Sequence, residues 1–226
     1  MAAFPAGKGI DMGAGLKLWT AVAAALLGLV AAASPSPVGT WRLHDGPDMA
    51  SELLIRPDGT FAYFLAAGAL DEQAKGRWVR EGDCILLTTA PTPKPAQFAA
   101  GAVSKISEAP LRLKVVSPRG EGIPGVDLVV GFAAGEPAES YTQEYGWELS
   151  PDEKRQPTWV QFAIPMYGLL SPRFAIDAGK ANDLTFVLTP NDLGIPDFEG
   201  LQLDVESDRL VMHRGTDLLS YVREKD

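Results

Sequence analysis

Histidine and cysteine are the side chains with which this sequence could do nucleophilic or metal chemistry, and the chain has few of them. It contains two histidines, His44 and His213, and one cysteine, Cys84. Neither histidine has a second His or Cys at metal-ligand spacing. Neither is near Cys84 in the sequence, so we expect the cysteine to be a small buried hydrophobe rather than a nucleophile. A single cysteine also forms no internal disulfide.

Carboxylates are abundant, but a general acid–base pair must converge in a cleft, which sequence spacing does not show. Acidic residues lie close together at Asp71 and Glu72, Asp152 and Glu153, and Asp197 and Glu199. The stretch TPNDLGIPDFEG, residues 189–200, offers oxygen ligands but matches no known calcium loop. No Gly-x-Ser-x-Gly, phosphate-binding or Gly-x-Gly-x-x-Gly motif occurs. We therefore expect no enzyme, cofactor or metal, with an uncharacterised hydrolase as the weaker alternative.

Residues 1–33 are predicted to be a signal peptide. The apolar run KLWTAVAAALLGLVAAAS follows Lys8 and Lys17, and Ala31-Ala32-Ala33 before Ser34 fits the small-x-small rule for cleavage. The alternative is a retained anchor, but the run is short for a span of ~20 residues and no polybasic stop follows it. We expect a periplasmic or secreted protein with no stable membrane span after cleavage. Whether translation begins at Met1 or Met12 stays open.

The charge of the chain excludes one class of partner. Its formal net charge is −9, and removal of residues 1–33 makes it −10. Nucleic-acid binding needs a basic stripe that neutralises phosphates, and Lys and Arg form no cluster here. We expect no nucleic-acid partner.

Short apolar alternations separated by Gly, Pro, Asp and Asn follow residue 34 and predict an all-β fold. ELLIRPDGTFAYFL, residues 52–65, predicts a hairpin that turns at Asp58-Gly59 and places Phe61, Tyr63 and Leu65 on one face. GRWVREGDCILLTT, residues 76–89, predicts the next hairpin. The intervening GALDEQAK, residues 68–75, is expected to hold at most one helical turn.

A proline-rich break, APTPKPAQF at residues 90–98, interrupts this meander. The strands LRLKVV, GVDLVVGF and TWVQFAIP then predict a half-buried sandwich, and DLTFVL, GLQLDV, RLVMHR and LLSYVR return to a meander. We expect a β-meander at 34–100, a β-sandwich at 101–180, and C-terminal strands at 181–226 that complete the first barrel. Two sequential β-domains are the alternative.

The N-terminal part resembles lipocalin-like domains. Gly39-Thr40-Trp41 in VGTWRL opens the first strand, RPDGTF and GRW follow in meander order, and YVR at 221–223 ends the chain. In such barrels the opening tryptophan closes one end and an arginine from the last strand lies across its ring. The resemblance therefore implies a structural pair between Trp41 and either Arg223 or Arg214, worth ~0.5–2 kcal/mol. It also implies a barrel that holds a small apolar ligand, lined by Trp41, Tyr63 and Trp78.

The middle part resembles the transthyretin-like or carboxypeptidase-regulatory-like module, a prealbumin-type β-sandwich. VVSPRGEGIPGVDLVV and YTQEYGWEL carry the likeness, which covers residues 111–149. This module is generally non-catalytic, and that is what the resemblance implies; in the leading hypothesis this part mediates interaction. Five aromatic residues offer a surface for the alternative function, a glycan- or protein-binding module: Tyr141, Tyr145, Trp147, Trp159 and Tyr167. The leading hypothesis is a non-enzymatic envelope protein whose partner is a small apolar ligand or another envelope component.

Overall fold

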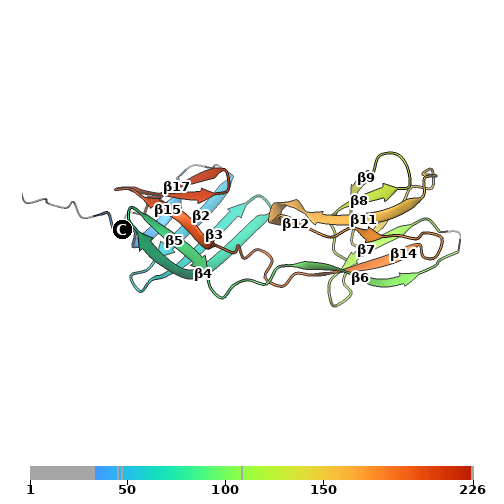
Figure 1. Ribbon diagram of the computed structural model, residues 1–226, viewed down its shortest axis with the longest axis horizontal. Coiled ribbons are helices and arrows are strands. Elements are labelled where there is room, and N and C mark those ends of the chain that lie inside the picture. Colours follow the sequence, from blue (N-terminus) through green and yellow to red (C-terminus); the bar gives the residue numbers. More distant parts are fainter. Residues whose placement is uncertain (1–33, 45, 47, 108, 225–226) are drawn as a thin grey trace, which may run out of the picture. The chain divides into compact units, whose positions relative to one another are not determined.

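The computed structural model describes residues 34–44, 46, 48–107 and 109–224. The predicted signal peptide, residues 1–33, lies outside the described residues. Within them the chain forms seventeen β-strands and one 3-10 turn, η1 (Pro165–Tyr167). The all-β prediction, a barrel with further sheets, is confirmed (Figure 1).

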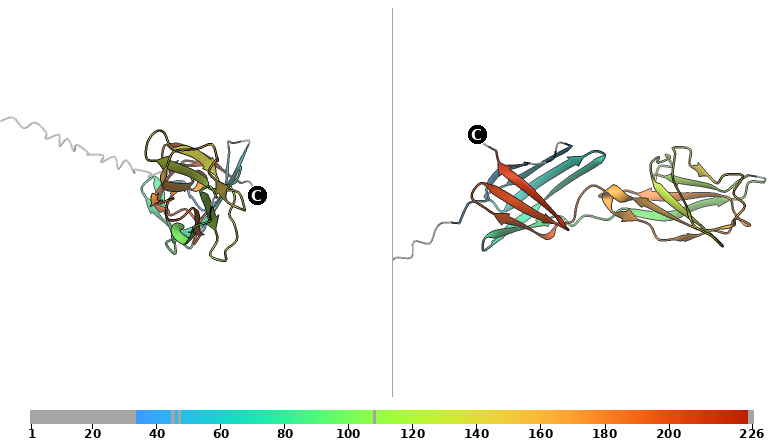
Figure 2. Two further views of the ribbon diagram at one scale, coloured as in Figure 1. Left: turned by 90° about the vertical axis from the view of Figure 1, so that its right-hand side faces the viewer. Right: turned by 90° about the horizontal axis from the view of Figure 1, so that it is seen from above.

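Eight antiparallel strands close into a barrel in the order β1-β17-β16-β15-β5-β4-β3-β2. Five come from the N-terminal part: β1 (Gly39–Leu43), β2 (Met49–Ile55), β3 (Thr60–Ala67), β4 (Leu70–Glu81) and β5 (Cys84–Thr89). Three come from the C-terminal part: β15 (Glu199–Val205), β16 (Arg209–Arg214) and β17 (Asp217–Arg223). Figure 2 shows the blue-to-green and the red strands in the same barrel.

Strand β1 closes the barrel because it pairs on both sides. Trp41 lies opposite Leu53 of β2 on one side and opposite Arg223 of β17 on the other. The first and last strands of the described chain are therefore neighbours, and the C-terminal strands complete the N-terminal meander.

The hairpin between β2 and β3 forms as the sequence indicates. Gly59 adopts φ +80°, and Asp58 Oδ1 accepts hydrogen bonds from the backbone N–H (3.0 Å) and hydroxyl (2.7 Å) of Thr60. The Asp58 carboxylate thus satisfies hydrogen-bond donors in the turn, and Gly59 supplies the positive φ that the turn needs. Phe61, Tyr63 and Leu65 are all buried on the inner side of β3.

Residues 68–75, expected to hold at most one helical turn, hold none and begin a strand that the sequence did not indicate. After a turn at Gly68 the chain enters β4, which pairs with β3 from Leu70 to Arg77. Leu70, Glu72 and Ala74 alternate with exposed Asp71, Gln73 and Lys75. Because Glu72 occupies an inward position, residues 70–75 lack the strict apolar–polar alternation that predicts a strand.

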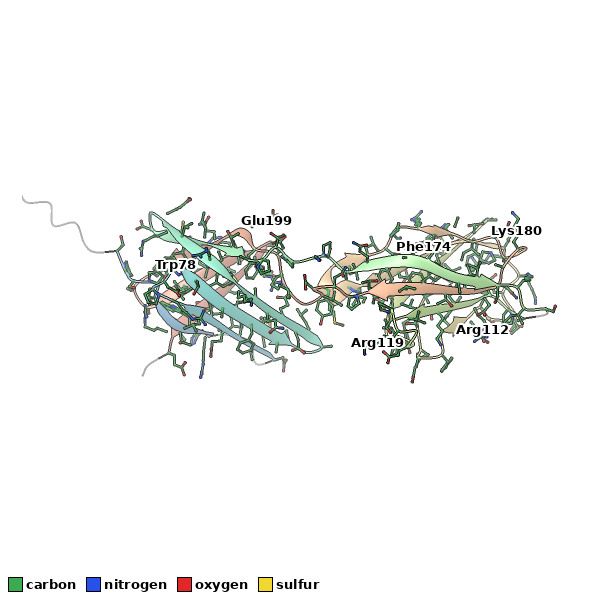
Figure 3. The ribbon with its side chains drawn as sticks, turned by 90° about the horizontal axis from the view of Figure 1, so that it is seen from below. Trp78, Arg112, Arg119, Phe174, Lys180 and Glu199 are labelled. Atoms are coloured by element: carbon green, nitrogen blue, oxygen red, sulfur yellow. The ribbon has the colours of Figure 1, made fainter. Side chains whose placement is uncertain are left out.

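The middle of the chain forms two sheets with one shared core. One sheet has the order β10-β7-β14-β6, with β6 (Gln97–Ser104), β7 (Arg112–Val116), β10 (Trp147–Glu148) and β14 (Asp183–Thr189). The other contains β8 (Asp127–Phe132), β9 (Ala138–Tyr141), β11 (Pro157–Ile164), β12 (Leu169–Leu170) and β13 (Phe174–Ala175). Phe162 of β11 and Phe186 of β14 meet across the core, with ring centroids 4.7 Å apart. Phe174, labelled in Figure 3, packs against Phe186, with the two ring centroids 4.9 Å apart.

Strand β14 lies in the stretch expected to return to the barrel, but it pairs with β6 and, in parallel, with β7. The barrel resumes only at Glu199.

The connecting segments, 90–96 and 190–198, are hydrogen-bonded to each other. Lys94 N donates to Asp192 Oδ2 (2.8 Å), and Asp192 N donates to Lys94 O (3.1 Å). An inserted unit whose ends lie close together leaves its host strands undisturbed.

Candidate functional site

Trp41 lies at the barrel end where β1 begins and β17 finishes, which we call the closed end. Its side chain is 0% exposed, and Nε1 donates to Pro37 O (2.7 Å). The guanidinium carbon of Arg223 lies 4.2 Å from the centre of the indole ring. Arg223, and not Arg214, therefore makes the stacked cation–aromatic contact with Trp41.

The same arginine fixes the segment that leads into β1. Arg223 donates from Nη1 to Val38 O and from Nη2 to Ser36 O, each at 2.6 Å. Arg80 Nη1 donates to Pro35 O (2.8 Å). Gly39 has φ +144°, and a side chain there would collide with Arg223 Nη1. Glycine at the first position of the Gly-x-Trp motif is favoured by this positive φ, and it also leaves room for the Arg223 guanidinium. Residues 35–38 cover this end.

Buried side chains fill the barrel between its ends. They come from β1–β5, β15–β17 and the second connecting segment: Trp41, Leu53, Ile55, Phe61, Tyr63, Leu65, Ala74, Ile85, Leu87, Phe198, Leu203, Val205, Leu210, Met212 and Tyr221. Phe198 enters from the segment before β15, and the centroid of its ring lies 5.2 Å from the ring centroid of Tyr63. The interior is a packed core over much of its length.

A charged network crosses the opposite end, which we call the linker end because β5 leaves and β15 enters there. Arg214 Nη2 donates to Glu72 Oε1 (2.6 Å), and Arg214 Nη1 donates to Tyr63 Oη (3.1 Å). Strands β16 and β4 are not neighbours, so this ion pair spans the barrel. The Glu72 side chain is 9% exposed and that of Arg214 is 31% exposed. The hydrogen bond to Glu72 raises the pKa of Arg214.

A second hydrogen-bonded pair lies next to this network. Ser51 Oγ is 2.6 Å from Phe64 O and 2.8 Å from Tyr221 Oη. A carbonyl only accepts, so Ser51 donates to Phe64 O, and Tyr221 donates to Ser51. Burial raises the pKa of both Tyr63 and Tyr221 above the ordinary value of 10.0. Both phenols are therefore neutral donors at physiological pH.

A groove of about 580 Å³ lies on the outer side of the same strands. Outward residues of β2–β4 form one wall: Glu52, Leu54, Ala62, Phe64, Gln73 and Lys75. The connecting segments form the other wall with Ala90, Pro91, Pro93, Asp192 and Ile195. Three buried residues also border the groove: Tyr63, Ala74 and Thr89. The connecting segments are held against the barrel, because Gln73 N donates to Gly194 O (2.9 Å) and Ala90 N donates to Lys75 O (3.0 Å). Backbone hydrogen bonds therefore fix the wall formed by the connecting segments to the barrel.

The groove has the size and the surface of a small-molecule site. Pockets that hold drug-sized ligands measure ~300–1,000 Å³ and combine apolar walls with few polar groups. Phe64 is 43% exposed, and it lies in this groove. Gln73 and Lys75 supply polar groups from β4 that could orient a ligand.

The residues predicted to line a ligand cavity take different places. Trp41 is buried at the closed end, and Tyr63 is buried beside Arg214, with only Tyr63 also bordering the groove. Trp78, labelled in Figure 3, packs against the barrel core and donates from Nε1 to Arg56 O (2.9 Å). Sequence reasoning named Glu72 only as a neighbour of Asp71, and it missed both the inward position of Glu72 opposite Arg214 and the groove. Only the register of Glu72, two residues from Ala74, could have indicated that it points inward.

The five aromatic residues of the middle part do not gather on one element. Tyr141 is exposed on β9 and Tyr145 is exposed in the following turn. Trp147 packs against the core from the other sheet. The indole of Trp159 lies on Gly131, and the guanidinium carbon of Arg173 is 4.1 Å from its ring centre. Both faces of this ring are thus covered by the chain itself.

The candidate chemical residues lie apart. His213 Nε2 is 2.7 Å from Asp204 Oδ2 on the outer face of the barrel, and His44 is exposed beyond β1. Cys84 is half-buried rather than buried, because it begins β5 at a turn and its Sγ contacts Glu81 O (3.0 Å). Across the described ranges no group of three or more His, Cys, Asp and Glu is arranged to hold a metal ion.

No helix among residues 34–44, 46, 48–107 and 109–224 is long and apolar enough to cross a membrane. Comparison of the chain with models of known families, with curated proteins and with solved structures gave no match. The fold and the site therefore rest on the geometry of this chain.

Proposed function

We propose that this chain is a non-catalytic binding protein of the bacterial envelope that holds a small apolar molecule in the groove outside β2–β4. The observation that carries the proposal is the groove itself, about 580 Å³ in volume, with Phe64 exposed in it. The packed barrel interior supports an external site, because a ligand inside would have to displace Phe198 and its neighbours.

The proposal includes a lipocalin-like origin for the barrel and a transthyretin-like origin for the middle sheets. Trp41 beneath Arg223, with β1 next to β17, supports the first. The sequence of residues 111–149 supports the second. Export rests on the apolar run and small residues of positions 1–33.

A fluorescence titration with N-phenyl-1-naphthylamine, an uncharged apolar probe, tests the ligand site. At about 0.3–0.4 kcal/mol per non-hydrogen atom, a probe of this size binds with a Kd of tens to hundreds of micromolar. Ala62→Trp places a large ring inside the groove and is expected to weaken binding about tenfold or more. Ala66→Trp, on the outer side of the same strand and outside the groove lining, is the matched control and should bind normally.

Two outcomes contradict the proposal: no fluorescence change with the parent chain, or equal binding by the Ala62→Trp variant. Native mass spectrometry of the chain purified from an envelope fraction without detergent then identifies the natural ligand. A discrete adduct that is retained by Ala66→Trp and lost from Ala62→Trp would give its mass.

A further inference from the structure

Strand β6 (Gln97–Ser104) is a free sheet edge of unusual composition. It ends the order β10-β7-β14-β6 and pairs only with β14. Along an edge strand, alternate N–H and C=O groups point away from the sheet and remain available to another strand. Eight residues give an edge about 27 Å long at ~3.4 Å per residue.

The side chains of β6 do not protect this edge. Its sequence, QFAAGAVS, has no charge and no proline, and every residue except Phe98 is exposed. Val103 is 63% exposed. Proteins usually block edges with charges, prolines, bulges or short strands. Strand β6 has one such feature, a register shift against β14 between Ala100 and Val103.

Other edges of the described sheets are protected in the usual ways. Strands β10, β12 and β13 are two residues long. Strand β9 has four residues and carries Glu139. The barrel has no edge because it is closed. The contrast shows that β6 alone combines length, exposure and lack of charge among the strands of the described chain.

We propose that β6 is a dimerisation strand that pairs antiparallel with β6 of a second copy, joining two sheets into one. The charge of the chain favours this occupant. Two copies of formal charge −9 repel each other over most surfaces, whereas the uncharged β6 can approach its own image without opposing like charges. Antiparallel pairing of β6 with itself brings the same segment of both copies together, which is what a two-fold interface requires. No residue of β6 lines the groove, so this inference is independent of the proposed ligand.

Sedimentation equilibrium of the full chain over a wide concentration range tests the proposal. We expect a monomer–dimer equilibrium, with Val103→Lys raising the dimer Kd about tenfold or more because the lysine is brought into an apolar strand pair. Val79→Lys is the matched control. Val79 is 55% exposed and lies on β4 of the barrel, so its replacement should leave the dimer intact. A monomer at all concentrations, or equal effects of the two lysines, overturns the proposal.

A charge exchange near the centre of β6 locates the interface directly. Ala100→Lys and Ala100→Glu each place like charges close together across a two-fold axis, so each variant alone should be monomeric. An equimolar mixture should recover the dimer, because the lysine of one copy then faces the glutamate of the other. Amide hydrogen exchange should show concentration-dependent protection of residues 97–104 in the parent chain. Failure of the mixture to dimerise, or protection confined to other strands, would sink the proposal.

Discussion

Both ends of the barrel are held by an arginine, but the two arginines have different partners. At the closed end, Arg223 lies over the Trp41 ring and donates to backbone carbonyls of residues 36 and 38. At the linker end, Arg214 crosses the barrel to the Glu72 carboxylate and the Tyr63 hydroxyl. The first end is stabilised by apolar burial and neutral acceptors, and the second by a charge that needs its counter-charge.

This difference predicts that the closed end contributes more to stability. Trp41→Ala removes a fully buried indole and the surface on which Arg223 stacks. The free energy of unfolding should fall by about 3–5 kcal/mol, the range for large aromatic residues in cores. Urea denaturation followed by circular dichroism measures the loss. Trp41→Phe, which keeps a ring at this position, should lose less than Trp41→Ala, and equal losses would show that the ring does not support this end.

The linker end should be fragile when one partner is removed and tolerant when both are changed. Glu72→Gln leaves Arg214 with a neutral partner in a largely desolvated position and should lower the free energy of unfolding by about 2–3 kcal/mol. The double variant Glu72→Gln with Arg214→Gln removes both charges and keeps side chains that can bond to each other. It should be more stable than Glu72→Gln alone. Arg214→Gln alone completes the comparison. If the double variant loses the sum of the losses of Glu72→Gln and Arg214→Gln, the charges do not interact across the barrel.

The closed end could be predicted from the sequence because its parts are local or follow a short motif. Gly39-x-Trp41 and the final Arg223 lie at the two ends of the barrel segment, and the Asp58-Gly59 turn sets the pairing of β2 with β3. The linker end could not, because no spacing relates position 72 to position 214. A glutamate beside Asp71 is typical of a solvated loop, and only the barrel closure brings it to Arg214.

Strand assignment shows the same limit. The alternation in DLTFVL fits a barrel strand and a sandwich strand equally well, and pairing with β6 and β7 over long sequence separations decides between them.

The groove could not be predicted from the sequence for a related reason. Its wall needs proline-rich segments, separated by about ninety residues, to lie against outward side chains of β3 and β4, which sequence patterns describe only as exposed.

The smallest expected effect is a difference in alkaline sensitivity between the two ends. Burial raises the pKa of Tyr63 above its ordinary 10.0, so the folded chain holds this proton when the unfolded chain has lost it. The stability from Tyr63 is therefore complete below pH 10 and is lost as the pH rises toward its folded pKa. At pH 11 the loss amounts to about 1.4 kcal/mol, the free energy of one pH unit.

Urea denaturation of the parent chain and of Tyr63→Phe at a series of pH values between 8 and 11 measures this contribution. It is the difference between the two chains in the slope of unfolding free energy against pH. The parent should lose stability more steeply above pH 10, because the phenylalanine variant has no proton to release at this position. Trp41→Phe alters the closed end without changing any titrating group, so its slope should match that of the parent. If Tyr63→Phe keeps the parental slope, the alkaline sensitivity belongs to Tyr221 or to groups outside the linker end, since burial raises the pKa of Tyr221 as well.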